Sequence, residues 1–233
     1  MTTKLQEPAR EGAATTLAHG FRALRVRNYR LFWIGQLISL VGTWMQGTAQ
    51  AWLVLQLTQS PLALGVVTTF QTLPIMTLAL FGGAIADRLP KYRLVLGTQT
   101  VALLQAVIFG VLVATDTLQL WHIYGLALVL GVINAIDTPT RQSFVVELVG
   151  RDDLPSAIAL NSILFNSARI VGPVLAGLLI SQLGIAPAFY INAASFLGVI
   201  TALLLMDRAT FRATPPRATT SILRGVWEGL TYA

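Results

Sequence analysis

The chain contains no cysteine and only two histidines, His19 and His122, which lie in different segments. Disulfide bonds and cysteine-based metal centres are therefore excluded, and two distant histidines do not form a metal site. Charged residues are also scarce, at 11% of the 233 residues. A soluble domain has about a quarter of its residues charged. The sequence thus predicts no metal and no cofactor, and its low charge argues against a soluble protein.

A net charge of +6 and a pI near 10.3 are compatible with nucleic-acid binding. We favour a membrane protein instead, because 55% of the residues are hydrophobic and the mean hydropathy is +0.68. In membrane proteins, basic residues collect in cytoplasmic loops, which explains the charge without a nucleic acid. We therefore expect the lipid bilayer, and no nucleic acid, as the surroundings of this chain.

Six apolar segments are each long enough to cross a bilayer as a helix of about 20 residues. They are residues 31–57, 62–86, 94–115, 119–137, 156–181 and 187–206. Each must be helical, because a lone apolar strand leaves its backbone unpaired in lipid. The sequence predicts an all-α membrane protein with a bundle of six transmembrane helices over residues 31–206.

The distribution of Lys and Arg predicts the orientation of this bundle. The connections at 58–61, 116–118 and 182–186 carry none. Of the 16 basic residues, six lie in residues 1–30, three in the turn at 87–93, two in a loop at 138–155 and four after residue 206. The remaining one, Arg169, lies inside a span. By the positive-inside rule, both termini are predicted to be cytoplasmic.

The two ends of the chain are interpreted as cytoplasmic segments. Residues 1–30 form a polar tail that ends in a basic interfacial segment from Phe21 to Arg30, placed near anionic headgroups. Residues 207–233 form a linker with the start of an amphipathic helix from Ser221.

Polar side chains recur along one face of the first predicted span, at spacings of 3 and 4. They are Gln36, Ser39, Thr43, Gln46 and Gln50. At about 100° per residue they share an arc of about 80°. Lipid does not tolerate such a stripe, so it faces other helices or a watery cavity. We favour a substrate cavity; the alternative is hydrogen bonding between helices.

The fifth span repeats this pattern with Ser162, Asn166 and Arg169 on one face. A mid-span arginine costs at least about 2.5–3.5 kcal/mol, so it must be paired or hydrated. We place Arg169 at the cavity floor, in contact with the substrate or with a glutamine of the first span. The alternative is a buried structural arginine bonded to carbonyls. Asn192 and Ser195 in the sixth span are interpreted as packing contacts.

Small residues in the fifth span recur at a spacing of four, at Ala168, Gly172 and Ala176. Such a face lets two helices approach closely. Pro173, directly after Gly172, removes one helical hydrogen bond and permits a kink.

A charged turn joins the second and third spans. It contains Gly83, Asp87, Arg88, Lys91 and Arg93. Asp137 closes the predicted fourth span at the same depth as these basic residues, so we expect it to pair with them rather than with the deeper Arg169. This arrangement predicts a cytoplasmic gate. We place no acidic residue in mid-span, so the sequence identifies no proton-coupling group.

Three segments carry a family likeness. The turn at 83–93, Gly-Ala-Ile-Ala-Asp-Arg-Leu-Pro-Lys-Tyr-Arg, resembles the loop signature of the major facilitator superfamily, with Pro in place of its second glycine. The segment with Gly172, Pro173 and Gly177 resembles the antiporter motif of drug exporters in that superfamily. Residues 137–161 are similar to the enterobactin-exporter and macrolide-efflux branch. The likeness runs from about Phe21 to the C-terminus.

The resemblance implies a proton-coupled exporter of small molecules, of drug or siderophore type, in the bacterial inner membrane. Such transporters work by alternating access between two six-span halves. In the family, the loop aspartate, here Asp87, faces a helix N-terminus of the second half and latches the cytoplasmic side. This chain resembles the N-terminal half alone. We favour a truncated or split product that lacks its C-terminal half over two copies that assemble.

Two other function classes compete with transport. An inactive fragment or a non-transporting membrane scaffold shares every fold signal with a transporter, and the polar stripes favour the transporter. An enzyme requires a convergent nucleophile and base or a metal site. The sequence shows neither, so we predict that the chain is not an enzyme.

Overall fold

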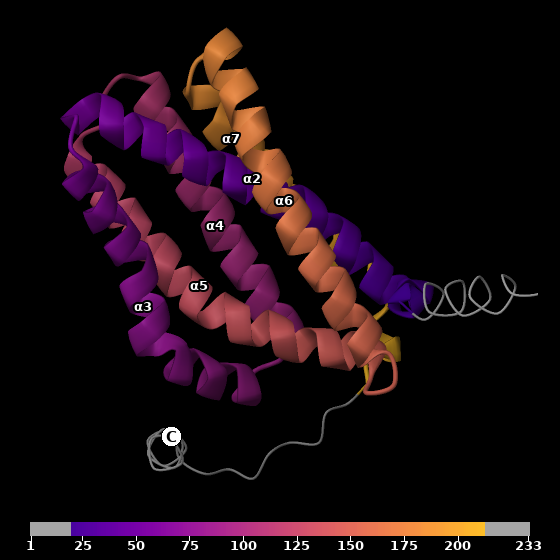
Figure 1. Ribbon diagram of the computed structural model, residues 1–233. Coiled ribbons are helices and arrows are strands. Elements are labelled where there is room, and N and C mark those ends of the chain that lie inside the picture. The colour runs from indigo at the N-terminus through magenta and orange to yellow at the C-terminus, as the bar shows by residue number, and fades with distance from the viewer. Residues whose placement is uncertain (1–19, 213–233) are drawn as a thin grey trace, which may run out of the picture.

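Six long helices and two short 3-10 helices make up the computed structural model, which describes residues 20–212 (Figure 1). The long helices are α2 (Arg27–Thr58), α3 (Pro61–Arg88), α4 (Lys91–Ala114), α5 (Leu120–Val149), α6 (Leu154–Leu183) and α7 (Ala186–Leu204). The 3-10 helices are η1 (Arg22–Arg25) and η2 (Arg208–Thr210). The predicted linker helix from residue 221 lies outside the described residues.

Local sequence signals explain where the helices begin and end. Proline lies in the first turn of α3, α6 and α7, where its fixed φ suits the helix and its missing N–H has no partner to lose. Gly184 ends α6 with φ of 83°, a left-handed conformation that glycine adopts without strain. The helical prediction is confirmed, and each helix covers most of its predicted segment.

One predicted boundary is wrong. The fourth span was expected to end at Asp137, with a loop at 138–155, but α5 continues to Val149 and includes Pro139. The charged side chain does not end the helix, because Asp137 is buried and paired inside the bundle. At about 1.5 Å per residue, Asp137 therefore lies about 18 Å from the end of α5.

The helices do not pack in chain order. α2 packs on α6 and α7, α4 packs on α5 and α7, and α3 packs on α5. Figure 1 shows α3 and α6 on opposite sides of the bundle, with α4 and α5 between them. Few contacts join α5 to α6. The space between α2, α5 and α6 is therefore where a cavity can form.

Apolar clusters hold the two ends of the bundle. One includes Phe32 and Phe144, whose rings meet edge to face with centroids 5.5 Å apart. The other includes Phe109 and Phe189, whose rings stack with centroids 4.2 Å apart. Such aromatic pairs stabilise helix packing beyond the area that they bury.

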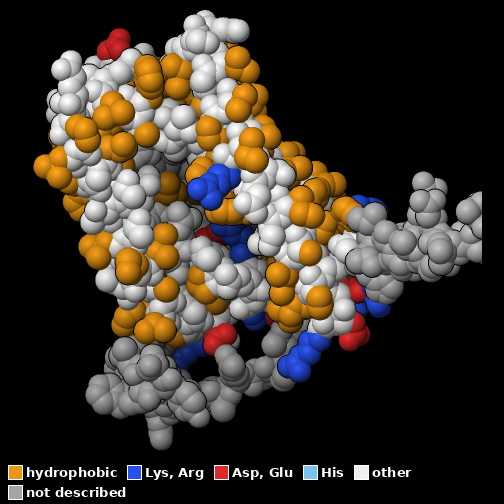
Figure 2. Space-filling model, viewed as in Figure 1, with side chains coloured by type: hydrophobic (Ala, Val, Ile, Leu, Met, Phe, Trp, Pro, Cys, Tyr) orange, Lys and Arg blue, Asp and Glu red, His pale blue; other side chains and the backbone are white. Residues whose placement is uncertain are grey.

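The surface has the character of a membrane protein. Five helices, α3 to α7, are long and apolar enough to cross a bilayer, and α2 is not among them. The polar stripe along α2 makes it the least apolar of the six long helices. Figure 2 shows an apolar outer surface with Lys and Arg gathered mainly toward one end. Six crossings and the orientation of the termini stay predictions.

The segment before α2 is docked onto the bundle. The Ala23 amide donates to Ser156 Oγ at 3.1 Å, and Ser156 Oγ donates to the Gly20 carbonyl at 2.7 Å. Arg22 forms an ion pair with Asp153 at 2.8 Å. Arg22, a basic residue of the segment predicted to lie near lipid headgroups, therefore pairs with an acid of the protein itself.

Candidate functional site

Asp137 is the centre of a buried polar cluster between α4 and α5. Its carboxylate is 1% exposed and forms an ion pair with Arg141, one turn further along α5. Thr98 Oγ1 and Gln99 Nε2 of α4 donate to the same Asp137 oxygen, at 2.5 Å and 3.1 Å. A buried carboxylate needs such donors because it has lost its hydration. The cluster therefore holds a charged group inside the bundle.

The prediction that Asp137 pairs with the basic residues of the turn at 83–93 is wrong, because the structure pairs it with Arg141. The pairing failed because Asp137 was placed at a helix end, whereas it lies well inside α5. Lys91, at the start of α4, instead contacts Glu147 with Nζ and Oε1 2.7 Å apart. Glu147 lies two residues before the end of α5, and both side chains are largely buried.

The other residues of the predicted gate lie at the same end of the bundle. Asp87 and Arg88 are exposed in the last turn of α3, and Arg93 is exposed in the first turn of α4. A side chain on Gly83 would meet nothing within 4 Å, whereas one on the neighbouring Gly82 would collide with the backbone of α5 at Ala135. Close packing of α3 on α5 therefore depends on Gly82, which carries no distinctive signal in the sequence.

Arg141 connects this cluster to a cavity. Its Nη1 donates to Gln36 Oε1 of α2 at 2.6 Å. Both residues line a cavity of about 580 Å³ enclosed by α2, α5 and α6. Asn161 and Ser162 of α6 face the same space among mostly apolar neighbours. Figure 2 shows a hollow on this face of the molecule with Lys or Arg side chains in it.

The predicted stripe on α2 divides between this cavity and the helix interior. Gln36 lines the cavity, but Gln46 is 3% exposed and accepts a hydrogen bond from Asn192 of α7 at 2.7 Å. Gln46 also donates to Gln105 of α4 at 3.2 Å. Hydrogen bonding between helices, the alternative interpretation of the stripe, is therefore what the structure shows at Gln46. The packing role of Asn192 and Ser195 is confirmed, since both are buried in this contact.

The remaining stripe residues also make contacts inside the bundle. Gln50 is buried and accepts a hydrogen bond from Gln71 of α3 at 3.4 Å. Ser39 is buried, and Thr43 donates to its carbonyl at 2.9 Å. These stripe residues thus make contacts inside the described bundle, and Gln36 is the stripe residue that lines the cavity beside Arg141. A substrate role of Thr43, Gln46 and Gln50 stays a prediction.

Arg169 and Asn166 lie on the exposed side of α6. The guanidinium of Arg169 sits 5.9 Å from the ring centroid of Trp44 on α2, within range of a cation–π contact. Arg169 is exposed in the described bundle, which therefore supplies no burial for the alternative of a buried structural arginine. Asn166 Nδ2 donates to the Ser162 carbonyl, one turn earlier in the helix. The contact of Arg169 with a substrate stays a prediction.

The small-residue face of α6 brings it close to α2. A side chain on Gly172 would come within 2.5 Å of Trp44 Cβ and 3.0 Å of the Met45 amide nitrogen. Ala168 and Ala176 are fully buried on the same face. The predicted close approach is confirmed there. A methyl group on Gly177, in contrast, would meet no atom within 4 Å, so this motif residue serves no packing inside the described bundle.

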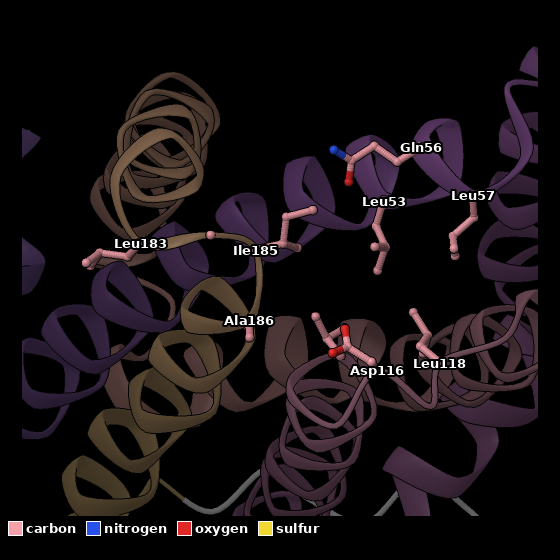
Figure 3. Close-up of a pocket in the computed structure, with 10 residues that line it drawn as sticks. Leu53, Gln56, Leu57, Asp116, Leu118, Leu183, Ile185 and Ala186 are labelled. Carbon is pink, nitrogen blue, oxygen red and sulfur yellow. The ribbon is translucent and has the colours of Figure 1, made fainter.

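A second, smaller cavity opens at the opposite end of the bundle, with a volume of about 390 Å³. Figure 3 shows Leu53, Gln56 and Leu57 of α2 along one side and Asp116 and Leu118 facing them from the connection before α5. None of the described residues that line it is cationic, and its acid is exposed. It contains fewer converging polar groups than the cavity beside Arg141.

Two residues that matter for this geometry, Arg141 and Glu147, were not predicted as site residues. Asp137 and Arg141 are spaced i, i+4, which places opposite charges on one face of a helix. That signal was available, but the segment was interpreted as a loop at 138–155 that follows a span ending at Asp137, whereas α5 continues to Val149. Gln99 and Gln105 were also missed, since single glutamines in an apolar run carry no distinctive pattern.

Comparison with known families decides the class of this bundle. The sequence model of the transmembrane secretion effector family matches residues 18–233. The chain belongs to this family of the major facilitator superfamily (MFS). It is therefore a multi-pass integral membrane protein of a transporter family, as the resemblance implied.

Three relatives illustrate what this MFS chain is similar to. It is 30% identical to an uncharacterized MFS-type transporter, YfiS, of Bacillus subtilis over 84% of this chain and 47% of the relative. It is 27% identical to the staphyloferrin A transporter of Staphylococcus aureus, over 78% and 46%. It is 29% identical to the multidrug efflux pump Tap of Mycolicibacterium fortuitum, again over 78% and 46%. The chain spans about half the length of these relatives.

Proposed function

We propose that the chain moves small molecules across the membrane by alternating access, as one six-helix half of an efflux transporter. The observation that carries this proposal is the cavity of about 580 Å³ between α2, α5 and α6, with a buried ion pair at its edge. Pockets of this size hold drug-sized ligands. The named relatives, a siderophore transporter and a multidrug efflux pump, support a siderophore or drug as the cargo.

The partner in this proposal is a second six-helix bundle, either a C-terminal half or a second copy of the chain. In the most apolar stretch of each helix, 11% of the residues are buried in α3 and 22% in α6, compared with 50% in α7. Two helices on opposite sides of the bundle (Figure 1) thus offer surface to another body. Relatives about twice as long support a second bundle, and alternating access requires one. In this arrangement the turn at 83–93 belongs to the gate.

We further propose that proton coupling uses Asp137. Among the acids in the described helices, it is the one that is fully buried. Its partner Arg141 lines the cavity, so a change in the charge of Asp137 alters the charge that the cavity presents.

Transport in proteoliposomes tests this function. The purified chain, alone and together with the C-terminal half of a relative, is assayed for uptake of staphyloferrin A and of a fluorescent drug under an imposed pH gradient. We expect uptake that a protonophore abolishes and that Asp137→Asn uncouples from the gradient. A folded bundle that moves neither solute in either combination would favour the non-transporting scaffold. Chemical cross-linking of differently tagged copies in the same samples separates a homodimer from a heterodimer.

A further inference from the structure

The cavity beside Arg141 presents a cation without an accessible anion. The Arg141 side chain is 28% exposed, whereas its partner Asp137 is 1% exposed. Arg141 is the one charged residue among the described residues that line the cavity. The pair is neutral as a whole, but only its positive member reaches the open space. A ligand in the cavity therefore meets guanidinium N–H groups rather than carboxylate oxygens.

Gln36 adds a donor that has no partner in the described protein. Gln36 is 5% exposed, and its Nε2 is buried without a hydrogen bond. The orientation of the amide is fixed, because Arg141 can only donate and so must meet the Gln36 oxygen. A buried donor left unpaired is costly, so a rotation of the Gln36 side chain that brings Nε2 to an oxygen atom of a ligand in the cavity would be favourable.

The rest of the cavity suits an apolar body. Most of the residues that line it are apolar, among them Phe32 of α2, Val145 of α5 and Phe165 of α6. Neutral polar groups come from α5 and α6, namely from Thr138, Gln142, Asn161 and Ser162. A volume of about 580 Å³ accommodates a small amphipathic molecule with one polar end.

We propose that this cavity binds an amphipathic anion, with its carboxylate or phosphate oxygens on Arg141 and the Gln36 amide and its apolar part between α2 and α6. Guanidinium and anionic oxygen form charge-assisted hydrogen bonds, which are stronger than neutral ones. The identification of this anion as the cargo rests on the proposed function. An anionic membrane lipid has the same chemistry and is the second source to distinguish.

Binding of radiolabelled 1-naphthaleneacetate to the full chain in nanodiscs of neutral lipid tests the proposal, with empty nanodiscs as the blank. We expect saturable binding that Gln36→Glu weakens about tenfold or more, because the new carboxylate competes for Arg141 and repels the anion. The same variant should gain binding of 1-naphthylmethylammonium. Glutamate has nearly the shape of glutamine, so a purely structural role of Gln36 would not produce this reversal.

Two further variants complete the design. Arg141→Gln should also weaken binding about tenfold or more. Arg151→Gln, which removes an exposed positive charge just after the end of α5, is the matched control and should leave binding unchanged. If Arg141→Gln does not fold because Asp137 loses its partner, the reversal in Gln36→Glu still decides the question.

The outcomes distinguish cargo from lipid as the source of the anion, and they test the anion site separately from the proposed transport function. Competition of the probe by phosphatidylglycerol in the nanodisc would assign the site to lipid, and unchanged binding would assign it to cargo. Equal binding of the anion to wild type, Gln36→Glu and Arg151→Gln, or no saturable binding at all, would overturn the proposed site. Because binding is measured without transport, a chain that transports nothing can still pass this test, and a transporter can still fail it.

Discussion

At the scale of single residues, the ion pair between Asp137 and Arg141 is the most consequential feature of the bundle. Both charges sit on adjacent turns of α5, and α4 supplies two further donors from Thr98 and Gln99. A pair of this kind holds a charge in an apolar environment only while every partner is present. Its proximity to the cavity makes it sensitive to whatever binds there.

Removing the negative member should destabilise the protein. We expect Asp137→Asn to lower the free energy of unfolding by about 2–4 kcal/mol, because Arg141 is left without its carboxylate and reaches water only through the cavity. Unfolding in mixed detergent micelles, followed by tryptophan fluorescence, measures the loss. The double variant Asp137→Asn, Arg141→Gln should lose less than the two single variants combined. Strict additivity would mean that the pair contributes nothing.

The ion pair between Lys91 and Glu147 joins the start of α4 to the end of α5. A double-mutant cycle with Lys91→Met and Glu147→Gln isolates its contribution from the other contacts of either residue. We expect a coupling of about 1–3 kcal/mol, above that of an exposed pair, since both side chains are largely buried. A cycle with Arg93 in place of Lys91 serves as control. A coupling below roughly 0.5 kcal/mol, the value of a surface pair, would contradict the role assigned to burial.

At the scale of elements, the glycines determine how closely helices approach. α6 meets α2 at Gly172, α5 meets α3 at Gly131, and α3 meets α5 again at Gly82. In lipid, where water does not drive apolar surfaces together, close van der Waals packing takes over much of that role. The identity of these small residues thus helps to fix the geometry around the cavity.

Two glycines of α6 give a matched pair of variants. Gly172→Ala should destabilise the bundle by about 1–3 kcal/mol, because the new methyl meets Trp44 Cβ at 2.5 Å and the α2 backbone at 3.0 Å. Gly177→Ala meets no atom within 4 Å and should be neutral or stabilising by up to about 1 kcal/mol. Thermal unfolding in detergent compares them. The reverse order would mean that α6 does not pack on α2 in this register.

At the scale of the whole molecule, the absence of cysteine permits a direct test of topology. Single cysteines are introduced at Ser60 and Thr117, in two connections without basic residues, and at Arg93, near the start of α4. In intact cells, we expect a membrane-impermeant maleimide to label the first two and to spare the third, as the positive-inside rule requires.

The same experiment tests whether α2 crosses the membrane. Its polar stripe makes it the least apolar of the long helices, but most of those polar groups are satisfied inside the bundle. A fourth variant, Arg25→Cys, places an exposed label before α2. Labelling of Ser60→Cys from outside, with Arg25→Cys and Arg93→Cys labelled only after permeabilisation, would support six crossings. Labelling of all four sites from one side would contradict the predicted topology.

Much of this molecule could be predicted from the sequence. Long apolar runs in a chain with few charges dictate helices, because lipid offers no partner to an open backbone. The spacing of Ala168, Gly172 and Ala176 predicted a close helix contact, which the structure confirms at Gly172. The end of α5 could not be predicted, because a charge and Pro139 resemble a loop unless the neighbouring helix that pairs with the charge is known.

The sequence by itself determined the helical class, the approximate bounds of every long helix except the end of α5, and the family, because these depend on local hydrophobicity and short motifs. Only the tertiary structure decided which polar residues line the cavity. Gln36 and Gln46 lie on one stripe of α2, yet one faces the cavity and the other bonds to α4 and α7. The reason is physical: the surroundings of a side chain depend on which helices pack beside it, and the helices here do not pack in chain order.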